Sequence, residues 1–149
     1  SVQPEVLLLF EGFNNIDGAL LGRDDEDMSI DVRPIRDDLF TMALNARDQG
    51  IEVLLATLTP VTDVREDAAP GTREAILALN SLIRGIATQL SLASVVDLYT
   101  ALDGIPGMIS ADGFHPTVAG YRRMAEIFSA TIVSRYDITP RPPVLTVAP

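Results

Sequence analysis

The chain has a single histidine, His115, and an aspartate precedes it at a spacing that suits acid–base chemistry. The two residues lie in the pentapeptide Asp112-Gly113-Phe114-His115-Pro116. A neutral imidazole whose Nδ1 proton is held by a carboxylate is an oriented general base, so this loop predicts a base and its orienting group together. A purely structural interpretation is also open. Asp-Gly is a common turn and proline suits the first position of a helix, so the same residues are typical of a helix start.

Apolar segments alternate with helical patterns along the chain. Continuous apolar runs typical of buried strands occupy residues 6–10, 51–58 and 93–99. Apolar residues recur at helical spacing over about residues 31–50, 73–90 and 117–132. This alternation favours one α/β domain, in which a parallel sheet is flanked by helices on both faces.

Two polar stretches are predicted to be surface loops, residues 17–31 and 61–72. The first is acidic, but it lacks the alternating oxygen ligands, central glycine and closing glutamate of a calcium loop. Four prolines after Tyr136 favour an extended tail or linker over residues 136–149. The domain itself is therefore expected to span residues 1–135.

Three turns are expected to converge at one edge of the sheet. The turn at Asn14 follows the first apolar run, the turn at Thr59 follows the second, and the pentapeptide of His115 follows the third. Ligands of open parallel sheets bind outside the carboxyl ends of the strands, which is where these turns lie. The carboxamide of Asn14 would there be a donor for a developing oxyanion near the base.

Composition excludes several classes of function. The net charge of -10 and the pI near 4.3 argue against nucleic acid or an anionic membrane surface as a partner, since either needs a basic face. Without cysteine, the chain has no disulfides or thiolate metal sites. No apolar run approaches the roughly 18 residues of a membrane span, and the first residues do not have the pattern of a signal peptide. The lack of cysteine and the proline-rich tail are compatible with an exported bacterial protein, and the localisation is otherwise undetermined.

Two motifs resemble conserved blocks of the SGNH, or GDSL-type, hydrolases. Glu11-Gly12-Phe13-Asn14-Asn15, which follows an apolar run, is similar to the third block, Gly-x-Asn-Asp. The pentapeptide, with Ala119-Gly120-Tyr121 soon after it, is similar to the fifth block, Asp-x-x-His-Pro. The motifs occur in the right order about 100 residues apart, so the pair is more specific than either motif alone. The resemblance covers about residues 4–132 and implies an SGNH/flavodoxin-like three-layer α/β fold.

The resemblance implies a carboxylic ester hydrolase in which a serine attacks the ester carbonyl. His115 would be the base, Asp112 its orienting group and Asn14 an oxyanion donor. We expect Gly12, Asn15 and Thr59 to line the site. Asn15 replaces the aspartate of the family motif, and its side-chain oxygen can still cap the following turn. The resemblance implies a small ester as substrate and no metal or cofactor.

The first and second blocks of the family have no counterpart in this sequence. These blocks carry the serine nucleophile, in Gly-Asp-Ser, and a glycine of the oxyanion hole. The serines after Ser1 have neither a Gly-Asp-Ser nor a Gly-x-Ser-x-Gly context, and Ser1 itself precedes the first strand, at the wrong end of the sheet. By the family's topology the chain begins just before the third strand, which would leave the run 6–10 with an apolar edge. We therefore hypothesise that the chain is the C-terminal portion of a hydrolase whose nucleophile lies on an N-terminal portion, from the same precursor or another chain.

Two other functions stay open. The chain could be a non-catalytic α/β binding or assembly domain that kept the fold and lost the nucleophile. It could also be a carbohydrate O-deacetylase, since the family includes enzymes that remove acetyl groups from sugars. An aromatic content of 5% without tryptophan offers no evident stacking platform for a sugar, and this favours a small ester.

Overall fold

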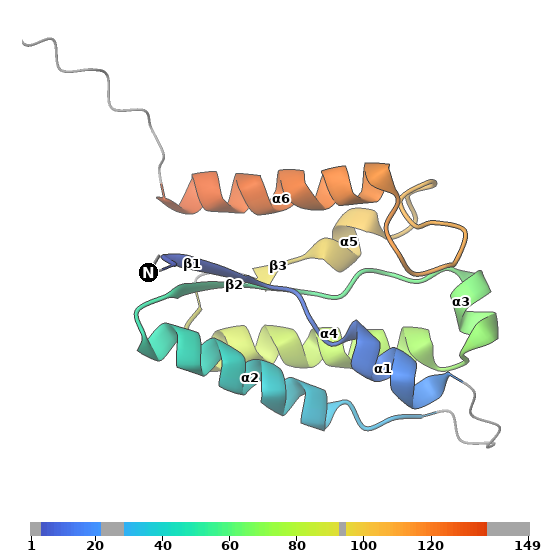
Figure 1. The fold of residues 1–149 in the computed structure, drawn as a ribbon, viewed down its shortest axis with the longest axis horizontal. Coiled ribbons are helices and arrows are strands. Elements are labelled where there is room, and N and C mark those ends of the chain that lie inside the picture. The colour runs from blue at the N-terminus through green and yellow to red at the C-terminus, as the bar shows by residue number, and fades with distance from the viewer. Residues whose placement is uncertain (1–3, 22–28, 93–94, 137–149) are drawn as a thin grey trace, which may run out of the picture.

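A computed structural model describes residues 4–21, 29–92 and 95–136, which form three layers (Figure 1). The middle layer is a parallel sheet in the order β1 (Val6–Leu9), β2 (Glu52–Ala56) and β3 (Val95–Val96). One face of the sheet carries α1 (Phe13–Leu20), α2 (Arg33–Asp48) and α4 (Thr72–Gln89). The other face carries α5 (Leu98–Leu102) and α6 (Val118–Tyr136). A short helix, α3 (Asp63–Ala68), follows β2, and the predicted α/β fold is confirmed.

The central strand β2 explains why the apolar runs of the sequence are continuous rather than alternating. Val53 and Leu55 are buried in the core beneath α1, α2 and α4, whereas Leu54 and Ala56 are buried in the core beneath α5 and α6. Successive side chains of a strand point to opposite faces, so a strand covered on both faces needs apolar residues at every position.

Helix α4 is tied to the sheet by one polar side chain within its apolar face. Asn80 is only 1% exposed; its Oδ1 accepts a hydrogen bond from the amide of Leu58 at 2.7 Å and its Nδ2 donates to the carbonyl of Leu58 at 3.1 Å. Both backbone groups of Leu58 are therefore satisfied where the chain leaves β2. Both polar atoms of the Asn80 carboxamide are thus hydrogen-bonded, which gives this residue a structural role, and the two bonds fix the segment that leads to Thr59.

The outer face of α6 and the neighbouring part of β1 are less covered than their sequences suggest. Val118, Tyr121 and Ala125, here called the α6 strip, are exposed, although the helical spacing predicts them to pack. Met124 and Phe128, which the same spacing predicts to pack, do face the sheet, and Ile127 joins them there. Leu8 of β1, which points to the same side of the sheet as Val6 and Phe10, is 46% exposed. The first run is thus an edge strand in the described sheet and not a strand buried on both faces.

Short helices account for the other differences from the predicted elements. Asp17 to Leu20 belong to α1, and α3 lies within the stretch 61–72, so these parts of the predicted loops are helical. The third strand ends at Val96 and not at Tyr99, because Asp97 caps α5 through the amide of Thr100, and residues 93–94 of the predicted strand lie outside the described residues. Helices of five to eight residues have too few turns to show a clear apolar period.

The acidic centre of the first loop, at 22–28, and the predicted tail beyond Tyr136 lie outside the described residues. Within the part of the chain that is described, none of the helices combines the length and apolarity that crossing a bilayer requires.

Replacing Asn80 tests the link between α4 and Leu58. Asn80→Ala leaves a buried N–H and a buried C=O without partners, so we expect the free energy of unfolding to fall by about 2–5 kcal/mol. Urea denaturation followed by circular dichroism measures the loss. Gln49→Ala is the matched control, since the Gln49 amide donates to the carbonyl of Asn45 at an exposed position, and we expect its cost to stay below about 0.5 kcal/mol. Equal effects of the two substitutions would contradict this role of Asn80.

Candidate active site

The carboxylate of Asp112 shapes the loop and orients the imidazole at the same time. Its Oδ1 accepts hydrogen bonds from the amides of Phe114 and His115, both at 3.0 Å, and from the hydroxyl of Ser110 at 2.7 Å. Its Oδ2 lies 2.8 Å from Nδ1 of His115. The Phe114 amide, the Ser110 hydroxyl and the His115 imidazole, in that order, hold the pKa of the Asp112 carboxyl well below its usual range. With Nδ1 engaged by an anion, Nε2 is the ring nitrogen of His115 that can take a proton.

The loop is fastened to its neighbours by backbone hydrogen bonds. The amide of Ser110 donates to the carbonyl of His115 at 2.8 Å, and the amide of Thr62 donates to the carbonyl of Gly113 at 2.8 Å. Gly113 has a φ of +85°, and a Cβ added there would lie 2.6 Å from the amide nitrogen of Arg65. Only glycine lets the loop come this close to the first turn of α3.

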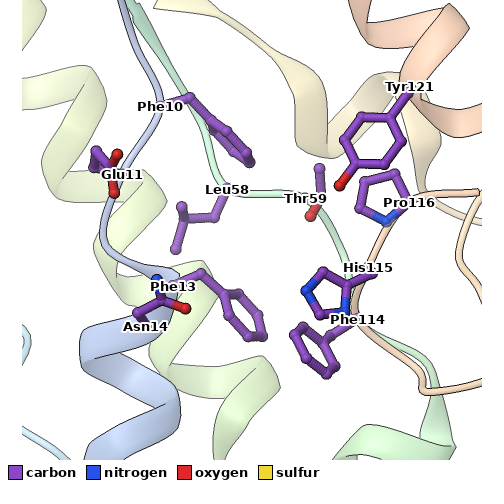
Figure 2. Close-up of a pocket in the computed structure, with 10 residues that line it drawn as sticks. All are labelled: Phe10, Glu11, Phe13, Asn14, Leu58, Thr59, Phe114, His115, Pro116 and Tyr121. Atoms are coloured by element: carbon purple, nitrogen blue, oxygen red, sulfur yellow. The ribbon is translucent and has the colours of Figure 1, made fainter.

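A pocket of about 180 Å³ opens beside the imidazole (Figure 2). Asn14, Thr59 and His115 all line it, so the three turns that were expected to converge do so at the carboxyl edge of the sheet. Asn14 reaches the pocket from the first turn of α1, on the side opposite to His115 (Figure 2). The remaining lining is largely apolar and aromatic and consists of Phe10, Glu11, Phe13, Leu58, Phe114, Pro116 and Tyr121.

Gly12 and Asn15 take positions different from the ones expected. They border a separate hollow against α2, with Ile35 and Leu39, and not the pocket of His115. The cause is that α1 begins at Phe13, so neighbouring residues point about 100° apart and Asn15 turns away from Asn14. Asn15 lies inside the first turn of α1. The N-cap residue of this helix is Gly12, and no side chain makes a capping hydrogen bond there, so the capping role expected for Asn15 is wrong. Gly12 has a φ of +117°, and a Cβ there would lie 3.1 Å from side-chain atoms of Ile35 and Leu79.

Several residues of the site were not found from the sequence. The rings of Phe13 and Phe114 stack at 5.1 Å with an angle of 2° between their planes, and Arg65 lies over the Phe114 ring at 5.0 Å. Phe114 and Phe13 stand inside the two motifs, but nothing in their spacing shows that the rings meet. Ser110 is a partner of Asp112 and so supports the orienting group. Among the described residues no cluster of histidine, aspartate and glutamate side chains could hold a metal ion.

Comparison with known proteins identifies the family to which this site belongs. The model of the GDSL-like lipase/acylhydrolase family matches residues 1–123. The chain belongs to this family. Its GDSL-type assignment agrees with the two motifs around Asn14 and His115. No curated protein matches the chain.

Three solved structures have the same fold as this GDSL-family chain. A lipase/acylhydrolase of Enterococcus faecalis is 27% identical with a TM-score of 0.69, the alignment covering 89% of this chain and 63% of that one. A GDSL-like lipase of Bacteroides thetaiotaomicron is 20% identical with a TM-score of 0.69, at 88% and 63% coverage. An acetylxylan esterase of Geobacillus stearothermophilus is 18% identical with a TM-score of 0.68, at 87% and 59% coverage. The chain thus spans less than two thirds of the length of these neighbours.

The two glycines Gly113 and Gly104 make a matched test of the loop geometry. Both have positive φ, but a Cβ at Gly104 would meet nothing within 4 Å. We expect Gly104→Ala to cost about 1–2 kcal/mol of unfolding free energy for the backbone conformation alone. Gly113→Ala adds the clash with α3 and should cost about 1–3 kcal/mol more. Chemical denaturation of both variants measures the difference, and equal costs would show that the loop is not seated on α3 as described.

Proposed function

We propose that this chain supplies the base, the orienting carboxylate and an oxyanion donor of a carboxylic ester hydrolase. One observation carries the proposal: the Asp112–His115 hydrogen bond of 2.8 Å stands at a pocket that Asn14 also lines. An oriented base and an amide donor facing one pocket are what acyl transfer to a hydroxyl requires. The membership in the GDSL-like lipase/acylhydrolase family supports the same reaction class.

The proposed reaction follows the chemistry of a serine hydrolase. Nε2 of His115 takes the proton from the serine hydroxyl as its oxygen forms a bond to the ester carbonyl carbon. The side-chain amide of Asn14 donates a hydrogen bond to the oxyanion. Protonated His115, stabilised by the carboxylate of Asp112, then gives its proton to the departing alcohol as the C–O bond breaks. In the second half of the reaction His115 takes a proton from water as the water oxygen bonds to the acyl carbon. His115 then gives that proton to the serine oxygen as the bond between serine and the acyl group breaks and the acid leaves.

The serine itself is proposed to lie on an N-terminal portion, from the same precursor or another chain. Three observations support this. The chain covers only 63% of the length of its first structural neighbours. In the described sheet β1 is an edge strand whose Leu8 is half exposed. Val118 and Ala125 of the α6 strip are exposed as well, and an added element would bury such apolar surface.

Reconstitution tests this function. We expect the isolated chain to be inactive on short p-nitrophenyl esters, and addition of the N-terminal portion to restore activity. In the restored enzyme His115→Ala should lower kcat/KM by about 10²–10⁴-fold, and Asn14→Ala by about 10²–10³-fold. Spectrophotometric release of p-nitrophenol measures each rate.

Thr88→Ala, an exposed change on α4, is the control for these variants and should leave the rate within about twofold. Full activity of the isolated chain would contradict the divided site. If His115→Ala left the biological activity of the protein untouched, the non-catalytic binding domain would be the correct interpretation.

The pocket lining favours one second candidate, a carbohydrate O-deacetylase. The chain has five phenylalanines and three tyrosines, and Phe10, Phe13, Phe114 and Tyr121 all line the pocket. The low aromatic content of the sequence led us to expect no stacking surface for a sugar. In the folded chain, however, four aromatic rings line one pocket. Aromatic faces suit the apolar faces of sugar rings.

A substrate comparison separates the two candidates. If sugar esters are the substrate, Phe10→Ala in the reconstituted enzyme should lower kcat/KM for an acetylated xylo-oligosaccharide about tenfold more than for methyl acetate, since only the sugar stacks on the ring. Acetate release measured by a coupled assay provides both values. Equal losses on the two substrates would exclude sugar stacking on Phe10 and leave the small ester.

A further inference from the structure

An ion pair lies beneath the candidate site, and the proposed chemistry does not use it. Arg65 of α3 is only 7% exposed, and its Nη2 pairs with Oδ1 of Asp17 of α1. A buried charge is costly unless a partner compensates it, so the two side chains hold each other in place. The pair joins two helices that are distant in the sequence, since Asp17 and Arg65 lie 48 positions apart.

Each member of the ion pair stands next to a residue of the site. Asp17 follows Asn14 by three positions on α1, so any shift of this helix at Asp17 also moves Asn14. Arg65 lies over the ring of Phe114, the residue immediately before His115. Phe114 in turn stacks on Phe13, the residue immediately before Asn14.

The loop of His115 also rests on the backbone at the start of α3. The amide of Thr62 holds the carbonyl of Gly113, and the amide of Arg65 is in close contact with Gly113. Arg65 therefore contacts the loop through its backbone and through its guanidinium, while its charge is bound to the helix of Asn14.

We propose that the Arg65–Asp17 ion pair is a positioning device, which sets the imidazole of His115 and the carboxamide of Asn14 relative to each other. The ion pair fixes α1 against α3, and Phe114 and Phe13 transmit that arrangement to the two adjacent site residues. The significance of Asn14 and His115 rests on the proposed hydrolase function. The structural coupling between these two residues does not rest on that function, so the experiment below measures it without an activity assay.

The alternative is that the ion pair only contributes to stability. Replacing a buried ion pair by apolar side chains of similar volume is often neutral or stabilising, because two charges no longer have to be desolvated. The double variant Asp17→Leu/Arg65→Met therefore separates the two roles. It should fold, but it lacks the directional link between α1 and α3.

The experiment uses NMR on the protein together with any N-terminal portion that accompanies it. In the double variant we expect the ring cross peaks of His115, assigned by their loss in His115→Gln, to shift and broaden. The amide of Thr62, which donates to Gly113, should exchange with solvent at least about tenfold faster. Asp17→Asn and Arg65→Lys, which each keep part of the pair, should give intermediate changes.

Arg73→Met is the control. Arg73 of α4 forms an exposed ion pair with Asp63, which lies on α3 like Arg65, and the substitution removes this pair. It should leave the His115 cross peaks and the Thr62 exchange rate as in the wild type. A folded double variant with wild-type values of both would overturn the positioning role and leave a structural one. The wild type provides a test that needs no variant: separate, slowly exchanging guanidinium resonances of Arg65 are expected, and a freely rotating guanidinium would overturn the proposal by itself.

Discussion

The carboxylate of Asp112 accepts hydrogen bonds from two amides, a hydroxyl and an imidazole, and the rest of the site depends on it. Two of these bonds close the turn that carries His115, so the group that orients the base also folds the loop that presents it. Because the same contacts favour the anion, they hold the pKa of the Asp112 carboxyl below its usual range. In the proposed reaction, the protonated imidazole of His115 would face this carboxylate.

The loop is held in place by its neighbours, through backbone hydrogen bonds and through the ring of Phe114, which packs against the core. Thr62, the residue just before α3, donates its amide to the carbonyl of Gly113, and the first turn of α3 lies so close to Gly113 that a side chain would not fit there. On the other side of the pocket, Asn14 belongs to the first turn of α1. The stacked rings of Phe13 and Phe114 join the two sides. The candidate site is therefore a contact between two short elements, and the sheet only brings them to the same edge.

Membership in the GDSL-like lipase/acylhydrolase family agrees with the occurrence of these parts together. The solved neighbours are longer, and this chain spans 63% or less of the three that were compared. In the described sheet the outer edge of β1 has no strand beside it, and α6 buries only Gly120 and Met124. An exposed apolar strand edge and an exposed apolar helix face are surfaces that proteins normally cover.

The sequence by itself determined the order of the main strands and helices, since long apolar runs and repeated helical spacing report burial directly. It also indicated Asp112, His115 and Asn14, because their roles depend on residue type and on local spacing within two motifs. Only the tertiary structure decided the rest. The short helices α1, α3 and α5 have too few turns to show a periodic apolar pattern in the sequence. Which face of α6 is buried depends on the elements that pack against it. The aromatic pocket is formed by residues from distant segments of the chain. Arg65 and Asp17 look like ordinary surface charges in the sequence, and only the tertiary structure buries Arg65 and brings Asp17 beside it, because contacts between distant segments leave no local pattern.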